Sequence, residues 1–303
     1  MSVPLGRARQ GTYSIVALDE ATGELGVAVQ SHWFSVGPIV PWALPGIGAV
    51  ATQANAEVSY GPRALELLEA GASAPDALAQ LLSEDPGAPS RQVAIVDRAG
   101  RTATHTGADC IAHAGHATGA GVSCQANIMA SATVWPAMLE AYEQARGPLR
   151  ERLLDALDAA EAAGGDLRGR QSAALLVVAP HAERWQRAVS LRVEDHADPL
   201  RELRRLLVLH DAYTLAGEAD QLVASARHAE AAERYRAANA LAPDNHELLF
   251  WAGLGTAQSG DLAGGAAQVA RAITLHPPWA ELLARLPPTV APSAASVRKQ
   301  LAG

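Results

Sequence analysis

The chain has 303 residues, of which 49% are hydrophobic and 18% charged, with a formal net charge of -8. Its length allows one large domain or two ordinary ones. Lys299 is the single lysine, and the acidic balance excludes a basic face for nucleic acid. No run approaches the roughly 20 apolar residues that span a bilayer, so we expect neither a nucleic-acid nor a membrane partner.

The first 31 residues predict a short leader followed by a β-hairpin. Residues 1–11 (MSVPLGRARQG) lack the apolar core of a signal peptide. Residues 12–19 alternate and are rich in β formers, EATGE predicts a tight turn, and residues 25–31 predict the second strand. Because a hairpin returns the end of its second strand to the start of its first, we expect Gln30–His32 beside Thr12.

The middle of the chain predicts strands and helices in runs of one type. Three prolines make VGPIVPWALPG an irregular loop, and Gly147-Pro148 breaks a long helix. These runs favour an α+β fold, with an antiparallel sheet or two stacked sheets between helix layers. The expected strands cover residues 46–53, 91–98, 101–106, 171–179 and 187–194, and the short segments CIAHAGHATG and GVSCQAN follow the strand at 101–106. The expected helices cover 61–71, 74–84 and 131–163.

The segment 199–285 predicts helices only and contains an internal repeat. Leu241 and Pro243 recur 34 residues later as Leu275 and Pro277. That period and the closing proline fit a pair of tetratricopeptide units, and the alternative is an alanine-rich helical hairpin. Residues 286–303 predict a flexible C-terminal tail.

Thr12 is a candidate nucleophile. A threonine at a chain N-terminus can be activated by its own α-amino group, whose pKa is near 8. The chemistry requires removal of the residues up to Gly11, and a glycine there leaves the hydroxyl room to attack. The alternative interpretation is an ordinary strand start, because threonine is a good strand former.

Polar side chains gather at three predicted strand ends. Asparagine and glutamine amides donate well to an oxyanion and bind amide substrates, whereas the alternative role for asparagine is turn formation. Two of the three ends carry the same tripeptide, Gln-Ala-Asn. The residues are Gln30, Ser31 and His32, then Gln53 and Asn55, and finally Gln125 and Asn127.

Two arginines complete the candidate site. Arg168 and Arg170 lie in a turn before a strand, where either can hold a substrate carboxylate or take part in a salt-bridged loop. Cys110 and Cys124 have neither the spacing of a zinc site nor that of a disulfide framework. We therefore expect no metal, no cofactor and a cytoplasmic location.

Several of these motifs closely resemble one family, catalogued as domain of unknown function 1028 and grouped with the N-terminal nucleophile (Ntn) hydrolases. The resemblance covers about residues 12–200. Its motifs are TYSIVALDEATGELGVAVQSHWFSVG, PGIGAVATQA, SYGPRALELL, RQVAIVD, HTGADC, QANIM, VWPAM and GGDLRGRQSAALLVV.

The resemblance implies a four-layer αββα sandwich over residues 12–198, followed by a small all-α helical-repeat domain. It also implies that Thr12 matches a threonine that relatives expose by losing their initiator Met. Eleven residues precede it here, so they are cut off, or the start lies further on, or the hydrolase is inactive. The Asp and Lys of the proteasome-like branch have no counterpart, which speaks against proteolysis by that constellation.

Two hypotheses follow. In the first, Thr12 attacks a small amide-like C–N bond, its freed amine is the base, and Asn127 with Gln30 steadies the oxyanion; Ser14 is the fallback nucleophile. In the second, the Ntn fold is inactive, and the helical repeats bind a ligand or a protein partner. In both cases we expect a homodimer or a higher homo-oligomer.

Overall fold

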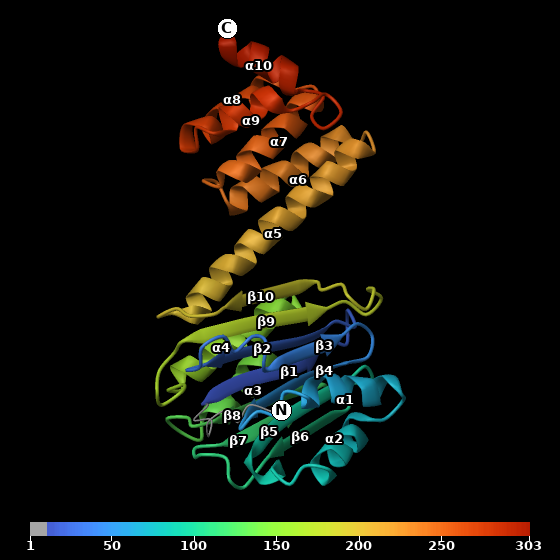
Figure 1. The fold of residues 1–303 in the computed structure, drawn as a ribbon, viewed down its shortest axis with the longest axis vertical. Coiled ribbons are helices and arrows are strands. Elements are labelled where there is room, and N and C mark those ends of the chain that lie inside the picture. The colour runs from blue at the N-terminus through green and yellow to red at the C-terminus, as the bar shows by residue number, and fades with distance from the viewer. Residues whose placement is uncertain (1–10) are drawn as a thin grey trace, which may run out of the picture. The chain divides into compact units, whose positions relative to one another are not determined.

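The computed structural model describes residues 11–303, so the expected leader lies outside the described residues except for Gly11. The chain divides into two compact units between Arg204 and Arg205, inside helix α5 (Pro199–Ala224). The expected boundary at residue 198 corresponds to the start of that helix. Figure 1 shows strands and helices in the N-terminal unit and helices alone in the other, which is a mixed α+β architecture with a helical C-terminal region.

Within the described residues, the N-terminal unit contains two antiparallel sheets. The six-stranded sheet has the order β10-β9-β2-β1-β8-β7. The expected hairpin is confirmed, because β1 and β2 pair from Thr12–Ser31 to Leu18–Leu25. The strands are β1 (Thr12–Leu18), β2 (Leu25–Ser31), β7 (Gly115–Gly119), β8 (Val122–Asn127), β9 (Ser172–Val178) and β10 (Val189–Val193).

The four-stranded sheet has the order β3-β4-β5-β6. Its strand β3 (Pro41–Leu44) lies where three prolines predicted an irregular loop. The difference has a simple reason: β3 is an edge strand and Pro41 is its first residue, a position at which proline is tolerated. The other strands are β4 (Gly48–Ala54), β5 (Arg91–Asp97) and β6 (Thr102–Thr106).

Four helices pack on the outer faces of these sheets. Helices α1 (Tyr60–Glu69) and α2 (Ala74–Ser83) contact the four-stranded sheet, followed by a short 3₁₀ helix at Ala88–Ser90. Helices α3 (Val134–Gln144) and α4 (Leu149–Ala162) contact the six-stranded sheet. The predicted break between α3 and α4 is confirmed, since Gly147 takes a φ of +105°.

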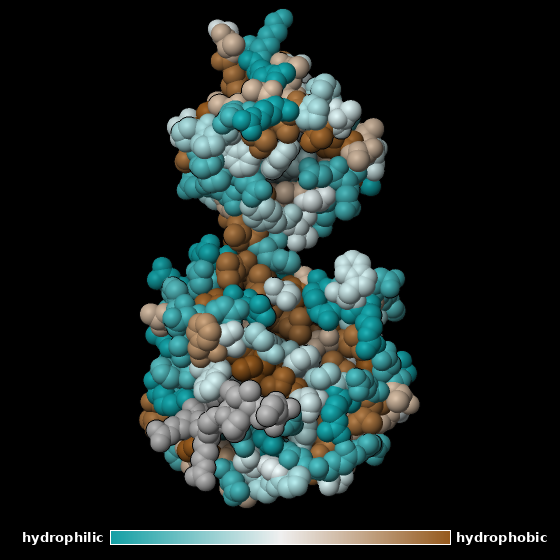
Figure 2. Space-filling model, in the orientation of Figure 1, coloured by the Kyte–Doolittle hydropathy of each residue, from teal (hydrophilic) through white to brown (hydrophobic). Residues whose placement is uncertain are grey.

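The two sheets face each other across a shared core. Val16 and Val27 of the six-stranded sheet pack with Ala49 and Ala94 of the other. Strand alternation sends these side chains inward and their neighbours, such as Ile95, towards the helices. Figure 2 shows hydrophobic residues among hydrophilic ones on one face of this unit.

The C-terminal unit is a stack of short helices. Gly253 of α7 allows close contact with α8, because an added β-carbon would lie 2.7 Å from the Gly265 carbonyl oxygen. The helices are α6 (His228–Leu241), α7 (His246–Gln258), α8 (Leu262–Leu275), α9 (Trp279–Arg285) and α10 (Ala294–Ala302).

Helix α10 occupies much of the segment expected to be a flexible tail. Its Ala294 and Val297 are buried in the same apolar cluster as Phe250. These two side chains lie three residues apart on one helix face, which explains why the segment is ordered. None of the helices within residues 11–303 combines the length and the hydrophobicity that crossing a bilayer requires.

Candidate active site

One end of the layer between the two sheets is polar instead of apolar. Thr12 and Ser14 on β1 face this layer, and their partners in register, Asn127 and Gln125 on β8, face it too. Gln92 on β5 enters it from the opposite sheet. All five are at most 1% exposed. Buried polar side chains of this kind are costly unless they are hydrogen-bonded, so their pairing carries information about the site.

The Thr12 hydroxyl lies against Ser31 as the hairpin register requires. Thr12 Oγ1 and Ser31 Oγ are 3.0 Å apart, and Ser31 Oγ donates to the Gly11 carbonyl oxygen at 2.6 Å. A serine hydroxyl has a single proton to donate, so Thr12 is the donor towards Ser31. The candidate nucleophile therefore points its proton at an oxygen acceptor.

A second donor converges on the same carbonyl. Arg168 Nη2 lies 2.8 Å from the Gly11 oxygen and 2.8 Å from Asp166 Oδ2. The Asp166 side chain is fully buried, and its Oδ1 also accepts the backbone N–H of Arg168 at 2.9 Å. Asp166 thus fixes the guanidinium that holds the Gly11 carbonyl.

The loop that carries Asp166 is anchored to the end of β8. Met129 pairs with Asp166 in an antiparallel bridge, and Leu167 N donates to the Ile128 carbonyl at 3.0 Å. Ile128 has a φ of +56°, which is unusual for a β-branched residue. Strained backbone of this kind concentrates at functional sites and persists only where its surroundings hold it.

A network of amides holds the backbone of Thr12. Gln53 Nε2 donates to the Thr12 carbonyl oxygen at 3.2 Å, and Asn127 Nδ2 approaches the same oxygen at 3.4 Å. Gln92 Oε1 accepts from both amides, at 2.8 and 2.9 Å. Ser14 Oγ donates to Gln53 Oε1 at 2.6 Å, so this fallback nucleophile is engaged in the network.

Several predicted site residues meet around Thr12. Ser31, Gln53, Asn127 and Arg168 contact it or the Gly11 carbonyl, and Gln125 joins through Ser14, to which it donates at 2.6 Å. His32 contributes its backbone N–H, 3.3 Å from Asp166 Oδ2.

Three predicted residues lie elsewhere. Gln30 is paired with Tyr13, so its side chain lies on the opposite face of the sheet from Asn127. Its side-chain amide is buried and has no hydrogen-bond partner among the described residues. Asn55 is exposed and donates to Ser90, and Arg170 forms an ion pair with Asp198.

The opposite face of β1 is anchored to the helix layer. The Tyr13 hydroxyl donates to Glu161 of α4 at 2.5 Å. Burial, together with the charge and hydrogen bond of Glu161, raises the pKa of Tyr13 well above its usual value. The phenol therefore stays protonated and fixes the strand one residue away from Thr12.

Sequence reasoning passed over Gln92 and Asp166 as site residues. Gln92 had a detectable signal, because it occupies an inward position of a strand whose other inward residues, Ala94 and Val96, are apolar. Asp166 had no such signal, since its role depends on a loop that folds back onto β8. In residues 11–303, no group of three or more His, Cys, Asp or Glu side chains is arranged to hold a metal ion.

Comparison with known families matches residues 12–203 to the family described as "Family of unknown function (DUF1028)". The chain belongs to this family. The match covers every site residue described above from Thr12 to Arg168. No curated protein matched the chain.

A solved structure supports the same assignment for this DUF1028 chain. The crystal structure of protein SPO2555 from Silicibacter pomeroyi, described as a DUF1028 protein, shares 33% sequence identity with a TM-score of 0.60. The similarity covers 65% of this chain and 84% of that one.

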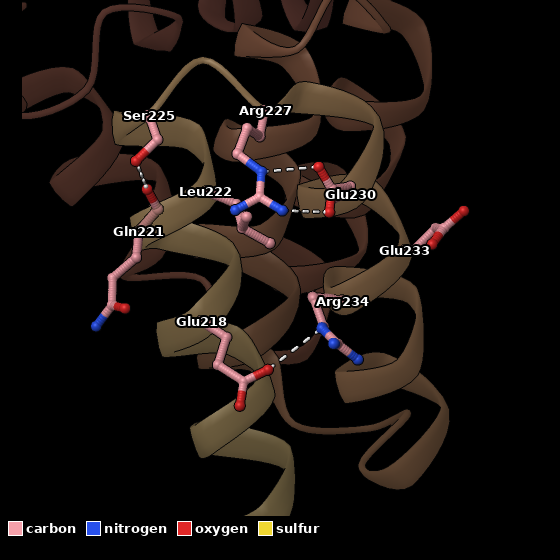
Figure 3. A pocket seen from close by; sticks show the side chains of 8 residues that line it. All are labelled: Glu218, Gln221, Leu222, Ser225, Arg227, Glu230, Glu233 and Arg234. Atoms are coloured by element: carbon pink, nitrogen blue, oxygen red, sulfur yellow. Dashed lines mark hydrogen bonds and ion pairs between the residues drawn. The ribbon is translucent and has the colours of Figure 1, made fainter.

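The helical unit of this DUF1028 chain lies beyond the family match and has a groove of its own. The groove has a volume of about 420 Å³ and lies between α5 and α6 (Figure 3). Arg227 pairs with Glu230 at 2.6 Å, and Arg234 pairs with Glu218 at 3.2 Å. Its charges are therefore largely satisfied within the groove.

Proposed function

We propose that residues 12–203 form an Ntn-type amidohydrolase in which Thr12, once N-terminal, attacks the carbonyl carbon of a small amide-like substrate. The observation that carries this proposal is the double hydrogen bond to the Gly11 carbonyl from Ser31 and Arg168, next to the Thr12 hydroxyl. Hydrogen-bond donors aimed at a carbonyl oxygen stabilise the negative charge that develops there during acyl transfer.

The same geometry supports removal of the leader by the chain itself. Thr12 Oγ attacks the Gly11 carbonyl carbon, the C–N bond breaks, and the hydroxyl proton passes to the Thr12 nitrogen. Water then hydrolyses the resulting ester. The products are a leader ending in a Gly11 carboxylate and a Thr12 with a free α-amine.

In turnover, the freed amine takes the proton from Thr12 Oγ, since its pKa near 8 suits a base at neutral pH. The substrate carbonyl takes the place of the Gly11 carbonyl, and Ser31 with Arg168 stabilises the oxyanion. The contacts of Asn127 favour a positioning role, because its amide approaches the Thr12 carbonyl and Gln92.

One feature of the fold supports this proposal, and another supports the expected helical repeat. Helices contact the outer faces of two facing sheets, an order consistent with a four-layer αββα Ntn sandwich. The close contact of Gly253 with Gly265 is consistent with tetratricopeptide-like packing in the helical unit.

The proposal is tested with a chain beginning Met-Thr12, from which Met is readily removed. We expect it to hydrolyse small amides, and we expect Thr12→Ala to abolish turnover while leaving the melting temperature within a few degrees. Thr22→Ala is the matched control, because Thr22 lies in an exposed turn. Turnover that survives in Thr12→Ala would contradict the proposal.

The second candidate is a binding module on an inactive Ntn fold. The groove between α5 and α6 favours it, because its paired charges suit a polar peptide segment better than an apolar one. This hypothesis expects residues 1–11 to be retained and amides to remain intact. A homodimer or a higher homo-oligomer is part of either proposal, and sedimentation showing a monomer at all micromolar concentrations would contradict it.

A further inference from the structure

The way the site holds Gly11 defines the acyl group that it can accept. If Thr12 acts as proposed above, a substrate carbonyl must reach the same donors that now hold the Gly11 carbonyl, Ser31 Oγ and Arg168 Nη2. The carbon next to that carbonyl must then take the place of the Gly11 α-carbon. The surroundings of Gly11 therefore describe the acyl side of the substrate.

Those surroundings leave no room for an L-side chain. A β-carbon on Gly11 would lie 2.5 Å from Asp166 Oδ2 and 2.8 Å from Arg168 Nη2. Contacts this short force one partner to move. Gly11 is thus required by the close approach of Asp166, in addition to any need for space at the Thr12 hydroxyl.

Asp166 is not free to yield. Its Oδ1 accepts the backbone N–H and Nε of Arg168 at 2.9 and 3.1 Å. Its Oδ2 accepts Arg168 Nη2 at 2.8 Å and the His32 backbone N–H at 3.3 Å. The Asp166 backbone pairs with Met129, and its side chain is fully buried. The carboxylate is therefore held in place beside Gly11.

We propose that the processed site is selective for amides of N-acylglycines, whose α-carbon carries no side chain, and that Asp166 with Arg168 sets this limit. Thr12 Oγ forms the C–O bond as the C–N bond breaks, the leaving amine takes a proton, and water hydrolyses the ester. The product is an N-acylglycine carboxylate, which Arg168 and Ser31 can hold as they hold Gly11.

Binding of the product acids tests the limit without any turnover. The protein is the species beginning at Thr12 recovered from the full chain, or a Met-Thr12 chain whose near-ultraviolet circular dichroism matches that of the full chain. Calorimetric titration should show N-acetylglycine binding at least about tenfold more tightly than N-acetyl-L-alanine, because the methyl group of the alanine derivative overlaps the Asp166 carboxylate. Equal affinities, or no binding of N-acetylglycine, would overturn the inference.

Turnover of the matched amides separates this inference from the proposed function. We expect the anilide of N-acetylglycine to be hydrolysed at least about tenfold faster than that of N-acetyl-L-alanine. Similar rates for the two anilides would contradict the proposed selectivity for N-acylglycine amides and would still support the proposed hydrolase activity. If the protein binds N-acetylglycine more tightly than N-acetyl-L-alanine but cleaves neither anilide, the selectivity is supported and the proposed hydrolase activity is contradicted. Leu167→Ala is the control, because its 69% exposed side chain should leave the preference unchanged.

Discussion

Asp166 Oδ2 lies 2.5 Å from the position that a β-carbon on Gly11 would occupy. The two residues are far apart in the sequence, and they meet because the Asp166 loop pairs with Met129 at the end of β8. Asp166 also holds the Arg168 guanidinium, which donates to the Gly11 carbonyl. The carbonyl of the peptide bond before Thr12 is therefore held by two side chains, Ser31 and Arg168.

Gly11→Ala should disturb this contact. The added methyl group overlaps Asp166 and Arg168, so we expect about 1–3 kcal/mol less free energy of unfolding in the full chain and slower loss of the leader. Denaturant unfolding measures the first effect, and mass spectrometry over time measures the second. Gly217→Ala is the control: nothing lies within 4 Å of its added carbon, and alanine favours the helix. If the two variants have the same unfolding free energy and lose the leader at the same rate, Asp166 and Arg168 do not restrict the residue at position 11.

Removing one partner of the Asp166–Arg168 pair should be more costly. Arg168→Met leaves the buried Asp166 carboxylate without its main partner, and we expect a loss of about 2–4 kcal/mol in unfolding free energy. Denaturant midpoints at pH 7 check this. Leu167→Ala, at the exposed position between them, should stay within about 0.5 kcal/mol. A small effect for Arg168→Met would mean that the pair does not hold the loop.

The tyrosines predict that the folded state becomes less stable at alkaline pH. Burial is the largest cause that raises the pKa of all five, neighbouring carboxylates add to it in each case, and the pKa of Tyr142 rises to about 12. The folded state binds these protons more tightly than the unfolded state, so their stabilisation is complete below about pH 10 and falls as pH rises further.

Absorbance at 295 nm during alkaline titration checks this. Native protein should show little tyrosinate near pH 10, whereas protein in denaturant should ionise there. Coincident titration curves would show that the phenols are not buried.

Asp85 predicts an acid limit. The Arg91 hydrogen bond is the main cause that lowers the pKa of Asp85, and it outweighs burial, with the Gly87 backbone N–H and the Tyr60 hydroxyl helping. Because the folded pKa lies below the unfolded one, this stabilisation is present above about pH 4 and is lost as pH falls through the folded pKa.

Asp85→Asn should cost about 1–3 kcal/mol at pH 7 and less at acid pH. Asp244→Asn removes an exposed pair with Arg271 and should cost under about 1 kcal/mol. Thermal melts from pH 3 to 7 compare the two. A pH-independent difference between wild type and Asp85→Asn would contradict the assignment.

Local signals in the sequence were enough for much of the fold. The Thr12–Ser31 hairpin and the break at Gly147-Pro148 follow from alternation and from backbone chemistry that acts over a few residues. Strand β3 and helix α10 were missed because pairing at a sheet edge and packing on the helical core override local preference.

The site was predictable only in part, for a geometric reason. A shift of one residue in strand register decides whether Gln30 or Ser31 shares the face of Thr12, and sequence alone did not settle that residue. The Gln53 and Asn127 amides were identifiable as polar strand ends. The Asp166–Arg168 contact with Gly11 depends on a loop returning across the sheet, which no local pattern encodes.

The intact mass of the purified full-length chain tests the central claim most directly. We predict that the chain expressed from Met1 loses residues 1–11 and yields a species beginning at Thr12, and that Thr12→Ala keeps the full mass under the same conditions. A chain that keeps Met1–Gly11 on every molecule and still hydrolyses the amides as fast as a chain begun at Met-Thr12 would contradict the N-terminal nucleophile assignment.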